Sequence, residues 1–107
     1  MKTYGLIDQS GRVFAFEVSV LGLGRRGLCR VAATVPGALV TKRPRFLSWF
    51  RQDEFCRFRV DGDDYAAMEP FGDNSRYWVG PDPPRWLPQT QRVRDAFERD
   101  KKPWFWP

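Results

Sequence analysis

Alternation of apolar and polar residues predicts two short β-strands at the start of the chain. Every second residue of the run 12–21 is large and apolar, which is the period of a strand with one buried face. That face carries Phe14, Phe16, Val18 and Val20. A shorter apolar run at 4–8 precedes it, and the Gln9-Ser10-Gly11 segment between the two runs has the composition of a turn. These residues therefore predict a hairpin.

A second hairpin is predicted around Pro36-Gly37. The segment 28–35 contains valine and threonine, which favour strands, and it follows a glycine-rich break at 22–27. Proline presets the first backbone angle of a turn, and glycine accepts a positive φ at the next position. Residues 38–43 then return as the partner strand, which brings both open ends of this hairpin together.

The second half of the chain continues the sheet. Strands are expected at 54–60, 63–69 and 76–79. The first two are joined by Asp61-Gly62, a strong signal for a tight hairpin turn.

A proline-rich connector and a helix are predicted to follow. Four of the nine prolines lie in residues 80–88, which predicts a stiff connector without regular structure. We expect a helix over 90–102, capped by Thr90. Its apolar stripe consists of Val93, Ala96 and Phe97. The aromatic tail 103–107 ends the chain.

Together these elements predict a single domain over residues 1–107. The predicted fold is of the α+β class and mainly antiparallel β, with five to six strands in a small curled or barrel-like meander and one C-terminal helix. A chain of 107 residues is long enough to bury about two-thirds of its unfolded surface in one core.

Composition and charge indicate recognition by arginine and aromatic side chains. The chain has fourteen arginines, four lysines, seventeen aromatic residues and no histidine, and its net charge is +5. Guanidinium groups bind carboxylates and phosphates through a planar fork and stack on aromatic rings. The positive charge is concentrated before residue 52, where it attracts acidic proteins or nucleic acid.

The hairpin predicted at Pro36-Gly37 gathers basic side chains at its open end. This cationic patch consists of Arg25, Arg26, Arg30, Lys42, Arg43 and Arg45, with Trp49 beside it. On an acidic protein the arginines speed encounter and the tryptophan anchors the partner. On nucleic acid the same cations contact phosphates while aromatic rings stack on bases. The alternative without a binding role is a solvated charged face.

The segment 69–78 is a second candidate binding site. Asp73, Arg76 and Tyr77 combine charge with an aromatic ring on a loop between strands, where binding residues concentrate. The structural alternative is an ion pair between Glu69 and Arg76 across that loop. Glu69 and Asp73 are also the pair of carboxylates that an acid–base enzyme would use.

Other chemistry is disfavoured. There is no histidine to act as a base, and neither Cys29 nor Cys56 has an activating partner. These two cysteines are far apart in sequence and lack metal-ligand spacing, so we expect free buried thiols, with one disulfide as the alternative if they lie on neighbouring strands. The glycine pattern at 22–27 lacks the helix that a dinucleotide site requires, because strand is predicted after it. Residues 61–64 lack the ligand spacing of a calcium loop. No cofactor and no metal are expected.

We therefore expect a non-enzymatic interaction module, such as a small bacterial adaptor, inhibitor or immunity-type protein, that binds an acidic protein. The alternative is a small nucleic-acid-binding β-barrel, and an enzyme using Glu69 and Asp73 ranks third. Neither a secretory signal nor a membrane-spanning run is present, which predicts a cytoplasmic protein without membrane contact. The tail 103–107 either covers an open side of the sheet or docks on a partner or on a second copy of the chain.

Overall fold

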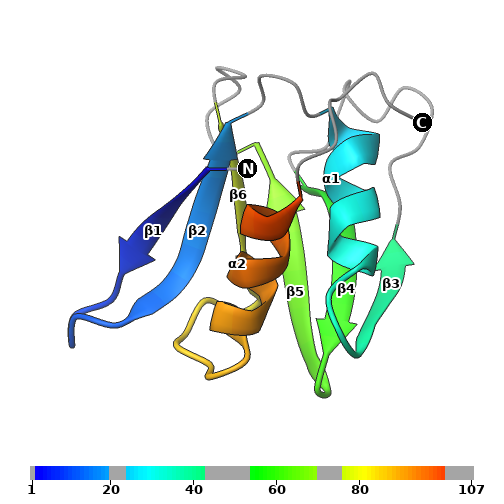
Figure 1. Ribbon diagram of the computed structural model, residues 1–107. Helices are drawn as coiled ribbons and strands as arrows, with labels where there is room; N and C mark the ends of the chain where they lie inside the picture. The colour runs from blue at the N-terminus through cyan, green and yellow to red at the C-terminus, as the bar shows by residue number, and fades with distance from the viewer. Residues whose placement is uncertain (1, 20–23, 43–53, 70–75, 101–107) are drawn as a thin grey trace.

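The part of the chain that the structure describes folds into a six-stranded antiparallel sheet with two helices on one face (Figure 1). The computed structural model describes residues 2–19, 24–42, 54–69 and 76–100. The strands are β1 (Thr3–Ile7), β2 (Val13–Ser19), β3 (Ala38–Lys42), β4 (Glu54–Val60), β5 (Asp63–Met68) and β6 (Arg76–Pro81), and the helices are α1 (Arg25–Ala33) and α2 (Thr90–Arg99). The order in the sheet is β1-β2-β6-β5-β4-β3, so β1 and β3 form its edges.

The core lies between the sheet and the two helices. α1 packs over β3 and β4, α2 packs over β1 and β2, and the helices also contact each other (Figure 1). Phe97 of α2 meets Phe16 of β2 edge to face, with 5.3 Å between ring centroids. Phe58 and Tyr65 stack at 5.4 Å and extend the core across β4 and β5. The predicted α+β, mainly antiparallel fold is thus confirmed, and the sheet is open, not closed into a barrel.

The strand predicted at 28–35 is wrong, because these residues belong to α1 and the turn after it. A helix buries positions three and four apart, and Leu28, Val31 and Ala32 are all fully buried under this arrangement. It also keeps Arg26 exposed and Arg30 partly exposed on the outside. Burial of this stripe on the sheet therefore outweighs the local strand preference of valine and threonine.

The predicted turns at 9–11 and at Asp61-Gly62 and the C-terminal helix are confirmed, but the helix ends at Arg99 and Thr90 does not cap it. The hairpin predicted around Pro36-Gly37 is wrong, because α1 and not a strand precedes that turn. Asp61 and Gly62 both have positive φ, 54° and 84°, as a two-residue hairpin turn requires. Gln89, not Thr90, holds the position before α2, and its side chain makes no capping bond. The Thr90 hydroxyl is buried and lies 2.8 Å from the Tyr65 hydroxyl, so it serves the core instead. Neither described helix has the length and apolarity needed to cross a membrane.

The sheet face away from the helices contains a tightly packed row of small residues. Gly80 of β6 lies opposite Ala66 of β5 and close to Ala15 of β2, and both alanines are fully buried. A Cβ on Gly80 would stand 2.7 Å from the Ala15 Cβ and 2.8 Å from the Trp78 ring. The Trp78 indole therefore lies directly across the glycine.

We expect Gly80→Ala to lower the free energy of unfolding by roughly 2 kcal/mol, because the Ala15 Cβ is fixed to the backbone and does not yield. The control is Gly5→Ala, whose new Cβ would meet the flexible end of Arg94 at 2.9 Å and should cost less. Urea unfolding measures both. A Gly80→Ala protein as stable as the wild type would contradict this packing.

Alkaline pH should destabilise the protein through two buried tyrosines. Burial raises the pKa of Tyr65 and of Tyr77, and the Glu69 carboxylate raises that of Tyr77 further. The unfolded chain releases these protons near pH 10, whereas the folded chain retains them. The contribution of these two tyrosines to stability is therefore fully present below pH 10 and falls as pH rises above it. Absorbance at 295 nm should show both tyrosines ionising only above pH 10. Ionisation of both at the ordinary tyrosine pKa, near 10, would contradict the prediction.

Candidate functional site

Arginine side chains in the structure are mainly bound to carboxylates of the same chain. Among the described arginines, all except Arg26 and Arg99 form an ion pair with an Asp or Glu side chain. Three guanidiniums also lie over aromatic rings: Arg12 over Trp86, Arg25 over Phe55 and Arg76 over Tyr4. Much of the arginine and aromatic content thus holds the fold together.

Three of the four described members of the predicted cationic patch are also bound to carboxylates of the chain. Their ion pairs are Arg25 with Glu69 at 2.6 Å, Arg30 with Asp100 at 3.5 Å and Lys42 with Glu54 at 3.3 Å. Arg26 is exposed on the first turn of α1. Arg43, Arg45 and Trp49 lie outside the described residues. Binding through this patch stays a prediction.

Glu69 is a structural partner of Arg25. The Arg25 Nε and Nη2 both lie 2.6 Å from one carboxylate oxygen of Glu69, and the guanidinium is 5.0 Å from the Phe55 ring centroid. Glu69 is 8% exposed, so this pair is shielded from solvent. Tyr77 is also buried, with its ring 4.9 Å from Phe55. Strand alternation places Tyr77 on the helix-facing side of β6.

The expected pair between Glu69 and Arg76 does not form. Arg76 instead donates to Glu17 at 3.2 Å and stacks on the Tyr4 ring at 3.7 Å. Its strand, β6, pairs with β2, which directs the side chain toward β1 and β2. Asp73 lies outside the described residues, so the proposed loop site and its enzymatic alternative stay predictions.

The glycine pattern at 22–27 runs into a helix, whereas a strand was predicted to follow it. α1 begins at Arg25, with Gly24 before it. A dinucleotide site also needs the two flanking strands to be parallel neighbours. β2 and β3 are separated by β6, β5 and β4, so the topology itself opposes that reading.

The acidic turn 61–64 is neutralised by arginines. Its ion pairs are Asp61 with Arg92 at 2.7 Å, Asp63 with Arg85 at 3.0 Å and Asp64 with Arg59 at 3.1 Å. The Gln89 amide donates to Asp63 as well, at 2.6 Å. The described ranges contain no cluster of three or more side chains suited to a metal.

Among the described residues, Arg57 is the centre of the largest ion-pair network. Its guanidinium contacts Asp82, Glu54 at 2.7 Å and Asp64 at 3.7 Å. The hydrogen bonds that the guanidinium donates to Asp82 and Glu54 raise the pKa of Arg57. One side chain therefore ties β4 to β5 and to the start of the connector.

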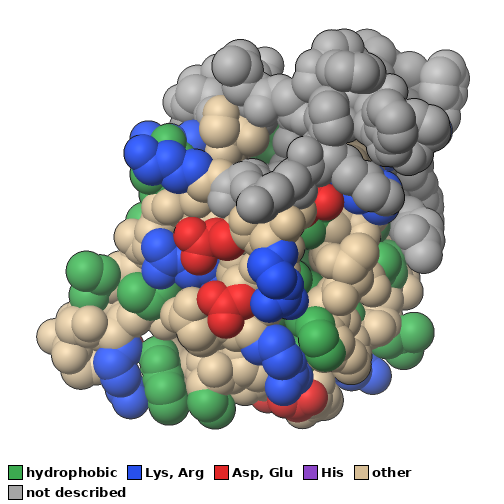
Figure 2. All heavy atoms as spheres, viewed as in Figure 1, with side chains coloured by type: hydrophobic (Ala, Val, Ile, Leu, Met, Phe, Trp, Pro, Cys, Tyr) green, Lys and Arg blue, Asp and Glu red, His purple; other side chains and the backbone are tan. Residues whose placement is uncertain are grey.

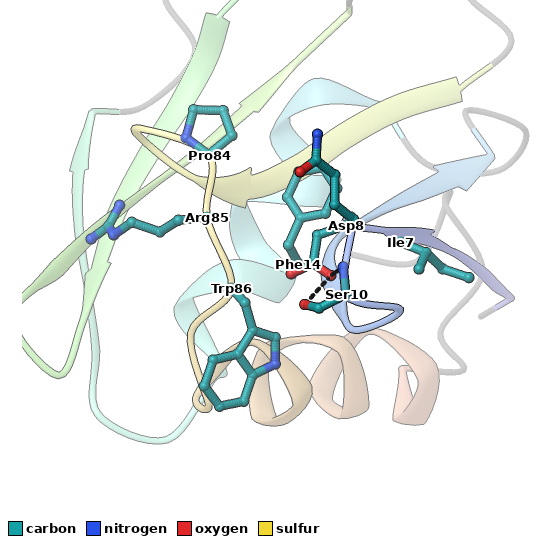
Figure 3. Close-up of a pocket in the computed structure, with 8 residues that line it drawn as sticks. Ile7, Asp8, Ser10, Phe14, Pro84, Arg85 and Trp86 are labelled. Atoms are coloured by element: carbon teal, nitrogen blue, oxygen red, sulfur yellow. Dashed lines mark hydrogen bonds between the residues drawn. The ribbon is translucent and has the colours of Figure 1, made fainter.

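A groove of about 730 Å³ opens between the β1–β2 turn and the connector after β6 (Figure 3). Its lining consists of Ile7, Asp8, Gln9, Ser10, Phe14, Pro84, Arg85 and Trp86. Phe14 reaches the groove because β2 bulges there: Ile7 pairs with Val13, but Leu6 pairs with Ala15. The bulge re-aims the Phe14 side chain. Phe14 is therefore only half-buried, not the core residue predicted from alternation.

The groove combines exposed apolar groups with a well-bonded rim. Ile7 is 65% exposed and Trp86 is 39% exposed. The Arg12 guanidinium lies 4.4 Å from the Trp86 ring centroid. On the rim, the Asp8 carboxylate accepts hydrogen bonds from the Arg12 and Ser10 backbone N–H groups at 3.0 and 2.9 Å. These bonds lower the pKa of Asp8, and the bond from the Arg12 N–H has the largest effect. They also hold the turn in one conformation.

Sequence reasoning did not identify this groove. Trp86 lies in the proline-rich connector, whose only predicted property was stiffness. The sequence did contain an indication of an exposed aromatic residue, because Trp86 lies in a connector without regular structure, and connectors lie at the surface. Its neighbour Arg12 is remote in sequence, so their contact was not predictable locally.

We expect Arg57→Met to lower the free energy of unfolding by about 1 to 2 kcal/mol, because it removes the ion pairs of this network. The loss is smaller than for a fully buried network, because the Arg57 side chain is partly exposed. Arg26→Met is the matched control and should change it by less than about 0.5 kcal/mol. Urea unfolding at low and at 1 M salt measures both. Equal effects of the two substitutions would argue against a bracing role for the arginine pairs.

The groove offers apolar contact more than reactive chemistry. Asp8 is occupied by the bonds of its own turn, and Arg85 is directed away from the groove toward Asp63 (Figure 3). The exposed residues of its lining are Ile7, Gln9, Ser10, Pro84 and Trp86, and the Arg12 guanidinium lies over the Trp86 ring. Neither a protein-family model, nor a curated protein, nor a solved structure matches this chain.

Proposed function

We propose that this chain is a non-enzymatic interaction module that binds a partner protein at the groove between the β1–β2 turn and the connector. One observation carries the proposal. The large hydrophobic side chains exposed among the described residues are Ile7, Leu39 and Trp86, and two of these three line the same groove. Figure 2 shows hydrophobic and basic side chains side by side over this end of the molecule.

The chemistry of the groove favours a protein over a small molecule. Tryptophan and arginine are the residues most enriched in protein-binding hot spots, and here Arg12 already lies over Trp86. A small-molecule site needs several convergent polar groups with free bonding capacity. Asp8 and Arg85 instead bond to the protein itself. Burial of the Ile7 and Trp86 side chains under a partner is therefore the main source of binding free energy at this groove.

The ion pairs also support a protein partner over nucleic acid. Arg25, Arg30 and Lys42 of the predicted cationic patch are each held by a carboxylate. A phosphate backbone would have to compete with those carboxylates for the same cations. The nucleic-acid alternative therefore rests on Arg26 and on basic residues outside the described ranges.

We expect Trp86→Ala to weaken binding at least tenfold for peptides selected against the wild-type protein from a random displayed library. Loss of an aromatic hot spot costs this much or more. Leu39→Ala is the matched control, since Leu39 is also an exposed hydrophobic residue, 62% against 39% for Trp86, but lies on the far edge strand. This substitution should change affinity less than twofold. Calorimetric titration with synthetic peptides measures both.

The selection also has results that would refute the proposal. If no peptide is selected, or if the selected peptides bind Trp86→Ala and Arg12→Ala as tightly as wild type, the groove is not the binding surface. Urea unfolding of each variant shows that it is folded.

A further inference from the structure

β1 leaves a row of backbone groups unpaired at the sheet edge. Among the described strands it pairs with β2 alone, and Figure 1 shows its outer side free. The Asp8 N–H donates to the Arg12 carbonyl at 2.8 Å, and the Asp8 carbonyl accepts from Gly11 at 3.0 Å. Both Asp8 groups therefore point inward.

The N–H and C=O groups of successive residues in a strand point to opposite edges. Since those of Asp8 point toward β2, the direction of these groups in each preceding residue is fixed. The N–H and C=O groups of Thr3, Gly5 and Ile7 then point to the outer edge. They have no backbone partner elsewhere in the described chain. This edge presents alternate donors and acceptors to a further strand.

The β1 edge lacks the features that usually prevent pairing. Proteins protect edge strands with charged residues, prolines or bulges on the edge strand itself. β1 reads Thr-Tyr-Gly-Leu-Ile, with neither charge nor proline, and the bulge in this hairpin lies on β2. The opposite edge, β3, carries Lys42 and an irregular register. Only β1 among the two described edges is thus suited to receive a strand.

Basic side chains border this edge. In the pair Arg12–Asp8 the arginine is 52% exposed and the aspartate 23%, and in Arg76–Glu17 the values are 44% and 20%. The cation is therefore the more exposed partner in both pairs, one near each end of β1. The Arg94–Glu98 pair on α2 has the reverse exposure, 22% and 45%, but the Arg94 guanidinium lies over Gly5 itself. An approaching strand meets positive charge first.

We propose that β1 is completed by an extended acidic segment of the partner protein, which adds as a seventh strand and reaches the groove at Ile7. The proposal rests on the proposed function and specifies its partner. Main-chain hydrogen bonds to β1 supply affinity, and alternate side chains supply specificity. Ile7 belongs both to β1 and to the groove, so the two surfaces are continuous.

The test uses a synthetic probe, an acetylated and amidated ten-residue peptide of alternating valine and glutamate. Two N-methylated isomers carry five methyl groups each, one on the valines and one on the glutamates. All valine N–H groups of a strand point to one edge and all glutamate N–H groups to the other. Methylation of the set that faces β1 should weaken binding at least tenfold, and methylation of the other set less than threefold.

Two further measurements check the edge and the charge. In the complex the amide protons of Gly5 and Ile7 should exchange at least tenfold more slowly, while those of β3 should not change. A peptide with lysine in place of glutamate should bind at least tenfold more weakly at low salt.

Equal affinity of the two isomers would overturn strand addition, as would absence of binding by the unmodified peptide. Equal affinity of the lysine peptide would overturn the acidic assignment. If the library peptides still require Trp86 in any of these cases, the proposed function stands and only the strand-addition proposal fails. If the library yields no peptide either, both fail.

Discussion

Burial of one face of the sheet beneath two helices is the constraint on which the rest of this structure depends. α1 packs over β3 and β4, and α2 packs over β1 and β2. Phe97 of α2 meets Phe16 of β2 in the core. The two strands that α1 joins in the chain, β2 and β3, are separated in the sheet by β6, β5 and β4, so β1 and β3 form its edges.

The same arrangement creates the groove. After β6 the chain must travel to the start of α2, and it does so along a connector whose Arg85 is bound to Asp63 at 3.0 Å. Arg92 of α2 is bound to Asp61 on the same turn. These pairs hold the connector at the β4–β5 turn, and the space between it and the β1–β2 turn remains open. Electrostatic pairing inside the fold thus shapes the proposed binding surface.

This use of arginine changes the meaning of the composition. An arginine- and aromatic-rich chain is expected to display those groups to a partner, yet most described guanidiniums here hold a carboxylate of the same chain. Arg12 serves both purposes, since it is bound to Asp8 and is also half-exposed over Trp86, which lines the groove. The groove and the outer edge of β1 meet at Ile7, so one extended segment of a partner is able to contact both.

Local signals in the sequence determined several elements of this protein. The strand at 54–60, the Asp61-Gly62 turn and the buried stripe of α2 are specified by side-chain period and by backbone angles that only certain residues adopt readily. Tertiary structure decided the rest. Residues 28–35 fit both strand and helix locally, and packing against β3 and β4 selected the helix. The bulge at Phe14, the pairing of Arg25 with Glu69 and the contact of Arg12 with Trp86 join residues that the chain brings together only after it folds. Sequence periodicity reports which side of an element is buried, whereas a binding surface depends on which elements become neighbours.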